Sequence, residues 1–325
     1  MKAIVYTKYG GVKALEMREL DRPSPADKEV LIKVHAVSIN DWDWGKLDGN
    51  SLFNRLFSGF LKPRHQILGS DIAGRIEAVG KKVTRFKVGD EVYGDLSGRW
   101  GGFAEYCCAG EGALELKPKC MSFVEAAAIP QAAMLAVQGI IDKGKIRQGH
   151  RLLINGAGGG VGTFGIQIAK QYGAEVTGVD HTDKQDMMRA IGFDHVMDYT
   201  KEDFTRNGRQ YDLVLDVKTN RHILHYLRAL KPKGMYVTVG GSMMFLFLAL
   251  ILKPLIAIFS KKKVGIVILK PNKDLVYMNE LYQSGTVKPI IDGHYSLEEV
   301  PKAFSLFGKA AHKGKIVILV GDGRS

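Results

Sequence analysis

A glycine-rich turn is the segment of this sequence best suited to chemistry. The residues from Gly156 to Gly162 read GAGGGVG, after the apolar run 152–154 and before a segment with helical periodicity. Small residues there let the backbone approach a pyrophosphate closely, and free N–H groups at a helix start favour phosphate. In the usual GxGxxG spacing the first position is Ala157, and a flexible loop without a ligand is the alternative interpretation. The predicted dinucleotide-binding residues are Gly156, Ala157, Gly158, Gly159, Gly160, Val161 and Gly162.

An acidic residue follows this turn at the spacing typical of a ribose-binding carboxylate. Asp180 ends the run GAEVTGVD, 21 residues after Gly159. A carboxylate there accepts hydrogen bonds from both ribose hydroxyls and repels a 2′-phosphate. Lys184 offers a positive charge to such a phosphate, and capping of the next helix is the alternative role for Asp180. The expected cofactor is NAD(P)H, with NADH slightly favoured over NADPH.

The elements that must position these residues change character along the chain. In the first third, β-prone runs (1–6, 29–37, 72–79, 91–93 and 103–109) are separated by Pro, Gly, Asp or Asn, which predicts a barrel-like β unit. Helical periodicity marks 123–141, and strands then alternate with helices, the strands falling at 151–155, 175–180, 195–199, 213–216, 235–239 and 265–269. This alternation predicts a parallel sheet covered on both faces. The tail after Lys288 returns to β-prone pieces and ends in a strand over 315–320. The fold class is therefore α/β, a doubly wound parallel sheet with a β-barrel domain.

A nearly apolar stretch runs from Met243 to Ser260 and is followed by three lysines, 261–263. Lys253-Pro254 divides the stretch, and neither half reaches the roughly 18 to 20 residues that cross a bilayer. An amphipathic element beside lysines suits an anionic lipid surface. Peripheral membrane contact through 243–263 is one interpretation, and a lid or a subunit contact is the other.

Composition sets outer limits on function and compartment. The chain has 325 residues, of which 46% are hydrophobic, and a formal net charge of +12. A basic balance suits nucleic acid, an anionic membrane or an anionic cofactor, but lysine and arginine are scattered apart from 261–263, so no nucleic acid is expected. Three cysteines, two of them adjacent, cannot form a disulfide framework, and the first residues carry no signal-like apolar run. A reducing, cytoplasmic location is expected.

Several further motifs occur in a fixed order. These are MKAIVY at the start, VSIN at 37–40, LGSDIAG at 68–74, GGFAEY at 101–106, the glycine-rich turn, and HKGKIVI at 312–318. Together they resemble the medium-chain dehydrogenase/reductase superfamily, and specifically its zinc-less quinone oxidoreductase branch. The resemblance implies a GroES-like domain built from 1–123 and 289–325 and a Rossmann domain over 124–288.

The resemblance also implies that no metal is bound. In zinc alcohol dehydrogenases of this superfamily, ligands stand where this chain has Asn40 and Ser70, and a second cysteine falls near Gln131. None of these three side chains is a good zinc ligand. The four-cysteine structural lobe is missing too, since this chain has only three cysteines.

Without a Lewis acid, hydride addition to an electron-poor quinone or enone is easier than alcohol oxidation, because conjugation spreads the developing charge. The resemblance likewise implies NAD(P)H-dependent reduction of quinones or α,β-unsaturated carbonyls. It makes Asn40 and Asp43 the catalytic candidates, although a turn cap is the alternative role for Asn40. It also places Tyr199 near the adenosine and puts Val239, Gly240 and Leu269 beside the nicotinamide. One departure is Thr219, which stands where the family has a glycine.

Two other functions stay open. One is a dinucleotide-binding protein with low turnover that associates with a membrane surface or a partner, and the other is a zinc-free alcohol dehydrogenase. The run Val264–Lys270 predicts an apolar edge strand, and a two-fold-related copy would cover it in a homodimer. The remaining expected partner is a small electron-poor carbonyl or quinone substrate.

Overall fold

The computed structural model describes residues 1–49, 55 and 58–321. The chain divides into two compact units, and each is described here by itself. Unit 1 comprises Met1–Gln131, Pro271–Gly285 and Ile291–Ser325, and unit 2 comprises Ala132–Lys270 and Thr286–Ile290. Segment 271–285 therefore groups with the β-rich unit, to which it is bonded through Asn272 Oδ1, an acceptor for the Asp95 N–H at 2.7 Å.

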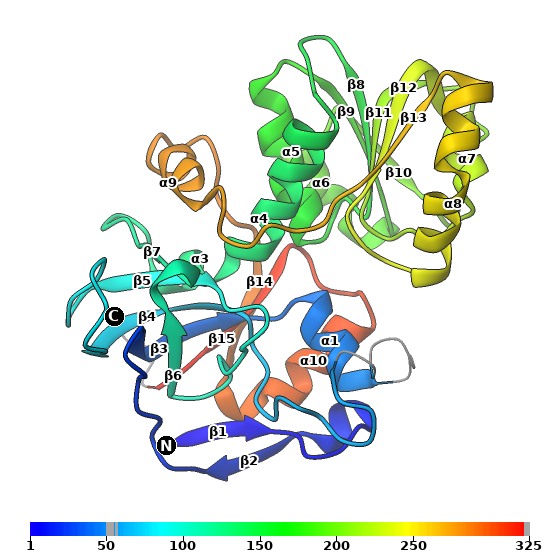
Figure 1. Ribbon diagram of the computed structural model, residues 1–325. Coiled ribbons are helices and arrows are strands. Elements are labelled where there is room, and N and C mark those ends of the chain that lie inside the picture. Colours follow the sequence, from blue (N-terminus) through cyan, green and yellow to red (C-terminus); the bar gives the residue numbers. More distant parts are fainter. Residues whose placement is uncertain (50–54, 56–57, 322–325) are drawn as a thin grey trace. The chain divides into compact units, whose positions relative to one another are not determined.

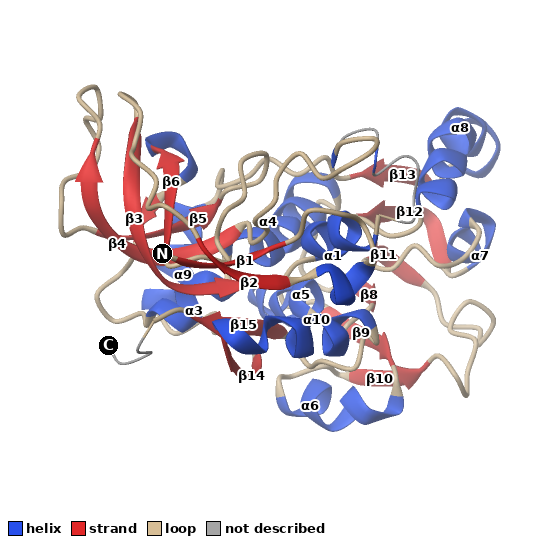
Figure 2. Cartoon of the chain, turned by 90° about the horizontal axis from the view of Figure 1, so that it is seen from below, coloured by secondary structure: helices blue, strands red, loops and turns tan. Residues whose placement is uncertain are grey.

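Unit 1 is built around one mixed sheet whose order is β14-β15-β3-β4-β5-β7, with β6 also paired to β3 and a separate β1-β2 hairpin (Figures 1 and 2). Its strands are β1 (Lys2–Val5), β2 (Glu16–Glu19), β3 (Glu29–Ser38), β4 (Asp71–Val79), β5 (Glu91–Asp95), β6 (Tyr106–Gly110), β7 (Glu115–Leu116), β14 (Ile291–Ser296) and β15 (Lys315–Leu319). Its helices are α1 (Asp41–Asp48), α3 (Phe123–Ala128), α9 (Leu275–Gln283) and α10 (Val300–Gly308), with 3-10 turns at Gly11–Ala14, Glu111–Ala113 and Leu297–Glu299. Most residues of the central strand β3 are buried, although Lys33 is exposed. One neighbour of β3 is the C-terminal strand β15, which pairs antiparallel with it through Ile318 and Val37.

Unit 2 is a six-stranded sheet of order β10-β9-β8-β11-β12-β13, in which every pairing is parallel. Its strands are β8 (Arg151–Asn155), β9 (Glu175–Asp180), β10 (His195–Asp198), β11 (Tyr211–Asp216), β12 (Leu230–Thr238) and β13 (Lys263–Ile266). Its helices are α4 (Pro130–Val137), continued by a π turn over Gln138–Lys143, α5 (Gly160–Gln171), a 3-10 turn at Thr182–Lys184, α6 (Gln185–Ala190), α7 (Ile223–Arg228) and α8 (Met243–Ser260). Figure 1 shows α5 and α6 on one face of the sheet and α7 and α8 on the other. This doubly wound arrangement, beside the β-rich unit, confirms the expected fold class.

Some expected elements are wrong in detail. The edge strand predicted over Val264–Lys270 is the shorter β13, and Val267 instead donates its N–H to Thr238 O at 2.9 Å. The strand expected from residue 103 starts at Tyr106, and helix α10 forms in a tail expected to hold only β-prone pieces. Helix α10 forms there because its apolar side chains Val300, Ala303 and Phe304 recur at helical spacing and are fully buried.

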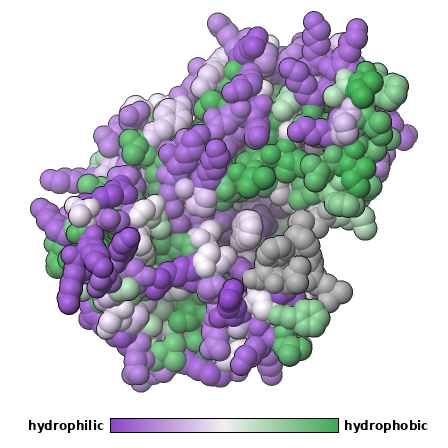
Figure 3. All heavy atoms as spheres, in the orientation of Figure 1, coloured by the Kyte–Doolittle hydropathy of each residue, from purple (hydrophilic) through white to green (hydrophobic). Residues whose placement is uncertain are grey.

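The apolar stretch Met243–Ser260 is one helix, α8, with Pro254 inside it, so the expected division at Lys253-Pro254 is wrong. Ala249, Leu252 and Ile256 form the side of α8 that packs against the core of unit 2. Much of the rest of the helix is exposed, and Figure 3 shows hydrophobic side chains gathered over it at the right of the view. Among the described residues no helix is both long enough and apolar enough to cross a membrane.

Candidate functional site

The glycine-rich turn connects β8 to α5 at the carboxyl end of the parallel sheet. Gly156 takes a positive φ of 88°, a conformation that favours glycine, and the turn is fixed by hydrogen bonds from the Gly156 and Ala157 N–H groups to Val179 O at 3.0 and 3.1 Å. The first intrahelical bond of α5 runs from Thr163 N–H to Gly159 O. The amides of residues 160–162 therefore have no intrahelical acceptor, and they form an anion-binding helix start.

The glycines of this turn differ in what they leave room for. A Cβ on Gly162 would lie 2.4 Å from Ala157 O, so only glycine lets α5 pack this close to the turn. A Cβ on Gly159 would have Gly156 O, 3.7 Å away, as its nearest neighbour, and the φ of Gly159 is an ordinary −93°. Gly162 is thus required by the fold, whereas the space beside Gly159 is open.

Asp180 lies at the end of β9 and bonds back to the turn. Its Oδ2 accepts the Gly158 N–H at 2.8 Å, and its Oδ1 accepts the His181 N–H at 2.9 Å. The ammonium of Lys184 lies 3.5 Å from Asp180 Oδ1, and both side chains are buried. The side chain of Lys184 also covers Gly158, since a Cβ there would meet Lys184 Cδ at 2.5 Å. The two predicted residues are therefore brought together with the turn.

The other predicted cofactor residues lie at the same carboxyl edge of the sheet. Tyr199 follows β10, is exposed, and its ring centroid lies 6.2 Å from that of His181, which follows β9. Val239 and Gly240 follow β12, and a Cβ on Gly240 would meet no atom of another part of the chain within 4 Å. Leu269 follows β13 and is half-buried. Because the ends of parallel strands share one edge, these residues line the crevice where such sheets bind ligands.

Thr219 shows how the chain tolerates the loss of a family glycine. It adopts a left-handed φ of 42°, which costs a residue with a branched Cβ about 1 to 2 kcal/mol. Its N–H donates to Asp216 Oδ1 at 2.9 Å, and its hydroxyl lies 2.5 Å from the Thr238 hydroxyl and donates to Gly240 O. These buried bonds hold the turn in the conformation that a glycine would adopt freely.

A buried network of polar side chains, which the sequence did not reveal, lies next to this edge of the sheet. Asp216 Oδ1 accepts from Asn155 Nδ2 at 2.8 Å, and Asp216 Oδ2 accepts from the Tyr236 hydroxyl at 2.7 Å. Tyr226 joins through its hydroxyl, which accepts from Asn155 Nδ2 at 3.2 Å. Burial raises the pKa of Asp216, against the lowering effect of the Tyr236 hydrogen bond. The network ties the ends of β8, β11 and β12 together, so it fixes the shape of the crevice.

In unit 1, Asn40 and Asp43 form the start of α1. Asn40 precedes the helix, and its N–H donates to Asp43 Oδ2 at 3.0 Å. Asp43 Oδ1 accepts the Gly69 N–H at 2.9 Å, so this fully buried carboxylate joins the helix to the loop before β4. Both carboxylate oxygens of Asp43 therefore accept backbone N–H groups.

Lys315, which the sequence reading did not select, holds the side chain of Asn40. Its ammonium donates to Asn40 Oδ1, donates to Ile39 O at 3.2 Å, and lies 3.8 Å from Asp71 Oδ2. Asn40 Nδ2 in turn donates to Ser70 Oγ at 3.3 Å. In the sequence, Lys315 belongs to the motif HKGKIVI at 312–318, which indicates the family but not a role for this lysine.

The charges of this cluster are strongly perturbed because every member is buried. Burial lowers the pKa of Lys315, while Asp71 and Asp43 act to raise it. Burial raises the pKa of Asp71, and the Lys315 ammonium opposes that rise. Burial also raises the pKa of Asp43 to about 7, despite the lowering effect of the Gly69 and Asn40 amides. A buried lysine among carboxylates with raised pKa values can hold or release a proton within the cluster.

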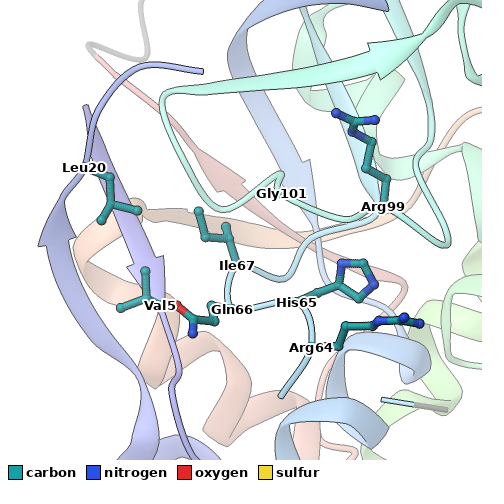
Figure 4. A pocket seen from close by; sticks show the side chains of 8 residues that line it. All are labelled: Val5, Leu20, Arg64, His65, Gln66, Ile67, Arg99 and Gly101. Carbon is teal, nitrogen blue, oxygen red and sulfur yellow. The ribbon is translucent and has the colours of Figure 1, made fainter. Parts of the chain in front are cut away.

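A separate pocket of about 410 Å³ in unit 1 contains none of the predicted residues. Figure 4 shows Arg64, His65 and Arg99 around it, on loops next to the β1-β2 hairpin. Arg99 Nη2 is already bonded to Glu29 Oε2 at 3.0 Å. This pocket is therefore distinct from the Asn40–Lys315 cluster.

Comparison with known proteins agrees with this geometry. Residues 26–119 match the model of the alcohol dehydrogenase GroES-like domain, and residues 191–318 match the model of the zinc-binding dehydrogenase. The 2-methylene-furan-3-one reductase of Solanum lycopersicum is 33% identical over 98% of this chain and 79% of its own length. The NADPH-dependent alkenal/one oxidoreductase of Arabidopsis thaliana is 31% identical over the same shares. The solved quinone oxidoreductase from Coxiella burnetii superposes with a TM-score of 0.88 at 27% identity, covering 98% of this chain and 99% of that one.

A dinucleotide-type crevice in one unit and a GroES-like β unit define a nicotinamide-dependent oxidoreductase. The chain belongs to the medium-chain dehydrogenase/reductase superfamily, in its quinone oxidoreductase-like branch. The resemblance seen in the sequence motifs is thereby confirmed.

The matched zinc-binding dehydrogenase model raises the question of a metal. In the described part of the chain, no three His, Cys, Asp or Glu side chains are placed so that they could hold an ion. The amide of Asn40 and the hydroxyl of Ser70 are poor zinc ligands, and the Lys315 ammonium lies against Asn40, where it repels a second cation. The residues present do not fit zinc.

A nicotinamide cofactor fits the residues present. The free amides of residues 160–162, the close packing that Gly162 permits and the open space beside Gly159 and Gly240 form a cradle for a dinucleotide. The Asp180 carboxylate lies beside this turn, where its Oδ2 accepts the Gly158 N–H.

Proposed function

We propose that this chain is a zinc-independent, NAD(P)H-dependent reductase of quinones or α,β-unsaturated carbonyls. The observation that carries the proposal is similarity along nearly the whole chain to an enone reductase, an alkenal/one oxidoreductase and a quinone oxidoreductase. The free amides at the start of α5 and the buried amide donor of Asn40 agree with it. Conjugated acceptors need less activation than alcohols, because their developing negative charge is delocalised.

The cofactor, when bound, supplies the hydride, and the chain binds and orients it. The amides of residues 160–162 bind the pyrophosphate, Asp180 binds the ribose, and Tyr199 lies beside the adenosine. Val239, Gly240 and Leu269 flank the nicotinamide. The hydrogen-bonded turn at Thr219 and the Asp216 network hold these residues in place, so little reorganisation accompanies binding.

Asn40 is the group proposed to touch the substrate. Lys315 holds its Oδ1, so Nδ2 is the donor side of the amide, and Ser70 Oγ and the Asp71 carboxylate lie beside Nδ2. In this proposal Nδ2 donates to the carbonyl or quinone oxygen on which negative charge develops. Lys315 and Asp43 act through Asn40, Lys315 by fixing the amide and Asp43 by fixing the backbone before α1.

The test is a substrate panel. Purified protein is assayed with NADH and NADPH against soluble quinones, enones and simple alcohols, with and without a chelator. We expect reduction of the conjugated acceptors, no oxidation of alcohols and no effect of the chelator. Asn40→Ala should lower kcat/KM by about 10- to 100-fold without changing cofactor binding, because one transition-state donor is removed. Alcohol oxidation that the chelator abolishes would overturn the proposal.

We propose further that NADH is preferred over NADPH, because Asp180 presents a carboxylate where a 2′-phosphate would lie. Asp180→Ser removes this charge, so the Lys184 ammonium, 3.5 Å from Asp180 Oδ1 in the wild type, would attract a 2′-phosphate that no carboxylate repels. The ratio of the Kd for NADPH to that for NADH should fall by about tenfold or more. Fluorescence titration with both cofactors measures it. An unchanged ratio would limit Asp180 to holding the Gly158 N–H.

A homodimer formed through the edge of β13 is also proposed. Among the strands that the structure describes, β13 pairs with β12 and ends the sheet, so its other side is an edge. The edge is four residues long, shorter than the seven expected from the sequence.

A further inference from the structure

The outer face of α8 is an exposed apolar surface that the proposed reaction does not use. Met244, Phe247, Ile251, Leu255 and Ile258 recur at helical spacing and are all exposed, Met244 by 68% and Ile258 by 71%. Phe259, at the end of the helix, is exposed by 83%. The core-facing residues Ala249, Leu252 and Ile256 form the opposite side. Figure 3 shows hydrophobic side chains gathered in the region of α8, at the right of the view. An area of this kind marks a binding surface.

The charge around α8 identifies what the face binds. The 57 residues from 217 to 273 contain eleven lysines and arginines and no aspartate or glutamate. The rest of the chain, with 35 basic and 34 acidic residues, is nearly neutral. The excess of positive charge is therefore concentrated on the segment that carries α8, and the expectation of scattered charge is wrong in this respect.

The lysines that follow α8 are arranged for an external partner. Lys262 is used internally, since its ammonium donates to Leu227 O at the end of α7 at 2.6 Å. Lys261 and Lys263 on either side of it are exposed, beside the equally exposed Phe259. A partner for this surface must accept apolar side chains and supply negative charge at the same place.

We propose that the outer face of α8 binds peripherally to an anionic lipid surface. The helix lies in the plane of the interface with its apolar side chains among the acyl chains and with Lys261 and Lys263 at the headgroups. A second copy of this chain fits the outer face of α8 less well, because in a two-fold contact this face would meet its own basic segment, which offers no carboxylate to Lys261 and Lys263. Pairing through the β13 edge, by contrast, needs only backbone groups. The inference does not depend on the proposed activity, since it rests on exposed side chains and charge alone.

Vesicle flotation tests the proposal with the whole chain. Vesicles of phosphatidylcholine alone are compared with vesicles that contain about 30% phosphatidylserine, at low and at high salt. We expect binding to the anionic vesicles, weakened by salt, and little binding to the neutral ones. Activity with a water-soluble quinone is measured on every variant as a check on the fold.

Two variants separate the apolar from the electrostatic contribution. Phe247→Asn with Phe259→Asn should weaken binding by about tenfold or more, because two exposed aromatic rings no longer insert. Lys261→Glu with Lys263→Glu should weaken it by about 25-fold or more, at about fivefold for each lysine lost near the surface. Val88→Asn and the pair Lys81→Glu, Lys87→Glu are the matched exposed controls in unit 1 and should bind as the wild type does.

Three results would overturn the proposal. These are no binding to anionic vesicles, equal loss in the control variants, and binding that the lysine variant leaves unchanged. If the Phe247 and Phe259 substitutions instead convert a dimer to a monomer while vesicles are not bound, a second copy covers this face. Loss of vesicle binding with full soluble-quinone activity separates this inference from the proposed function.

Discussion

At the residue scale, the cluster around Asn40 fixes the orientation of the amide that we propose contacts the substrate. A free asparagine side chain can present either its oxygen or its nitrogen, but the Lys315 ammonium against Oδ1 leaves Nδ2 as the available donor. Lys315 is buried and requires a counter-charge, which Asp71 supplies at 3.8 Å. The orientation of the proposed donor thus depends on a buried ion pair whose acidic member lies on β4 and whose basic member lies on β15.

A double-mutant cycle tests this positioning role. Lys315→Met leaves Asp71 buried without its partner and should lower the free energy of unfolding by about 3 kcal/mol or more. Adding Asp71→Asn removes the uncompensated charge and should recover most of that stability, while kcat/KM stays low because Asn40 is no longer held. Urea unfolding and steady-state kinetics measure the two effects. Full recovery of kcat/KM in the double variant would reduce Lys315 to a structural residue.

The raised pKa of Asp43 predicts a pH dependence of stability. Its folded pKa of about 7 exceeds the ordinary value of 3.8, so between these values the folded chain binds more protons than the unfolded chain. The contribution of this group is therefore fully present below pH 4 and is lost as the pH rises through about 7. In Asp43→Asn this site no longer titrates, so stability should fall less steeply from pH 4 to 7.

Urea unfolding at several pH values measures this difference, with the exposed Asp21→Asn as the control. Asp43→Asn should also be less stable at every pH, because an amide has one acceptor oxygen for the Asn40 and Gly69 N–H groups. Identical pH slopes in the wild type and in Asp43→Asn would contradict the prediction.

At the element scale, two glycines in the turn between β8 and α5 have different roles. Gly162 is required for folding, whereas Gly159 leaves open space that we expect a cofactor to use. Gly162→Val should destabilise the chain strongly, because its Cβ would meet Ala157 O at 2.4 Å. Gly159→Val has room for its Cβ and should unfold within about 1 kcal/mol of the wild type, yet weaken NADH and NADPH binding by tenfold or more by filling the pyrophosphate approach.

Thermal unfolding and fluorescence titration of the two cofactors distinguish these outcomes. If Gly159→Val binds both cofactors as the wild type does, the pyrophosphate does not approach the turn at this residue. The pair is informative because both substitutions add the same side chain to the same turn.

At the scale of the whole molecule, the edge of β13 is where we propose that two chains associate. The Val267 N–H points inward to Thr238 O, and because direction alternates along a strand, the Ile266 N–H points outward. Ile266→Pro should therefore block pairing with a second copy and convert a dimer to a monomer in light scattering. Val267→Pro would instead break a bond within the chain. A wild type that is monomeric at high concentration would contradict the dimer.

Local sequence signals determined the larger part of the fold. The glycine-rich turn, the alternating strands and helices and the spaced motifs each depend on a few neighbouring residues, and they predicted the α/β class and the family correctly. The predicted cofactor residues after β8, β9, β10, β12 and β13 lie at one edge because parallel strands all end there. The periodicity of a strand or helix is visible in neighbouring residues, so these elements could be predicted without information about the tertiary structure.

Only the tertiary structure decided which polar residues act together. Lys315 reaches Asn40 across 275 positions of sequence because β15 pairs with β3, and Asn155, Asp216 and Tyr236 meet because β8, β11 and β12 are neighbours. The helix over Met243–Ser260 continues through Pro254. Its exposed face can be identified only because the structure shows that Ala249 and Ile256 pack in the core of unit 2. Composition could show that these residues are apolar or charged. Which of them are buried, paired or exposed depends on packing between residues far apart in the sequence. A pattern that repeats every two to four residues carries no information about such packing.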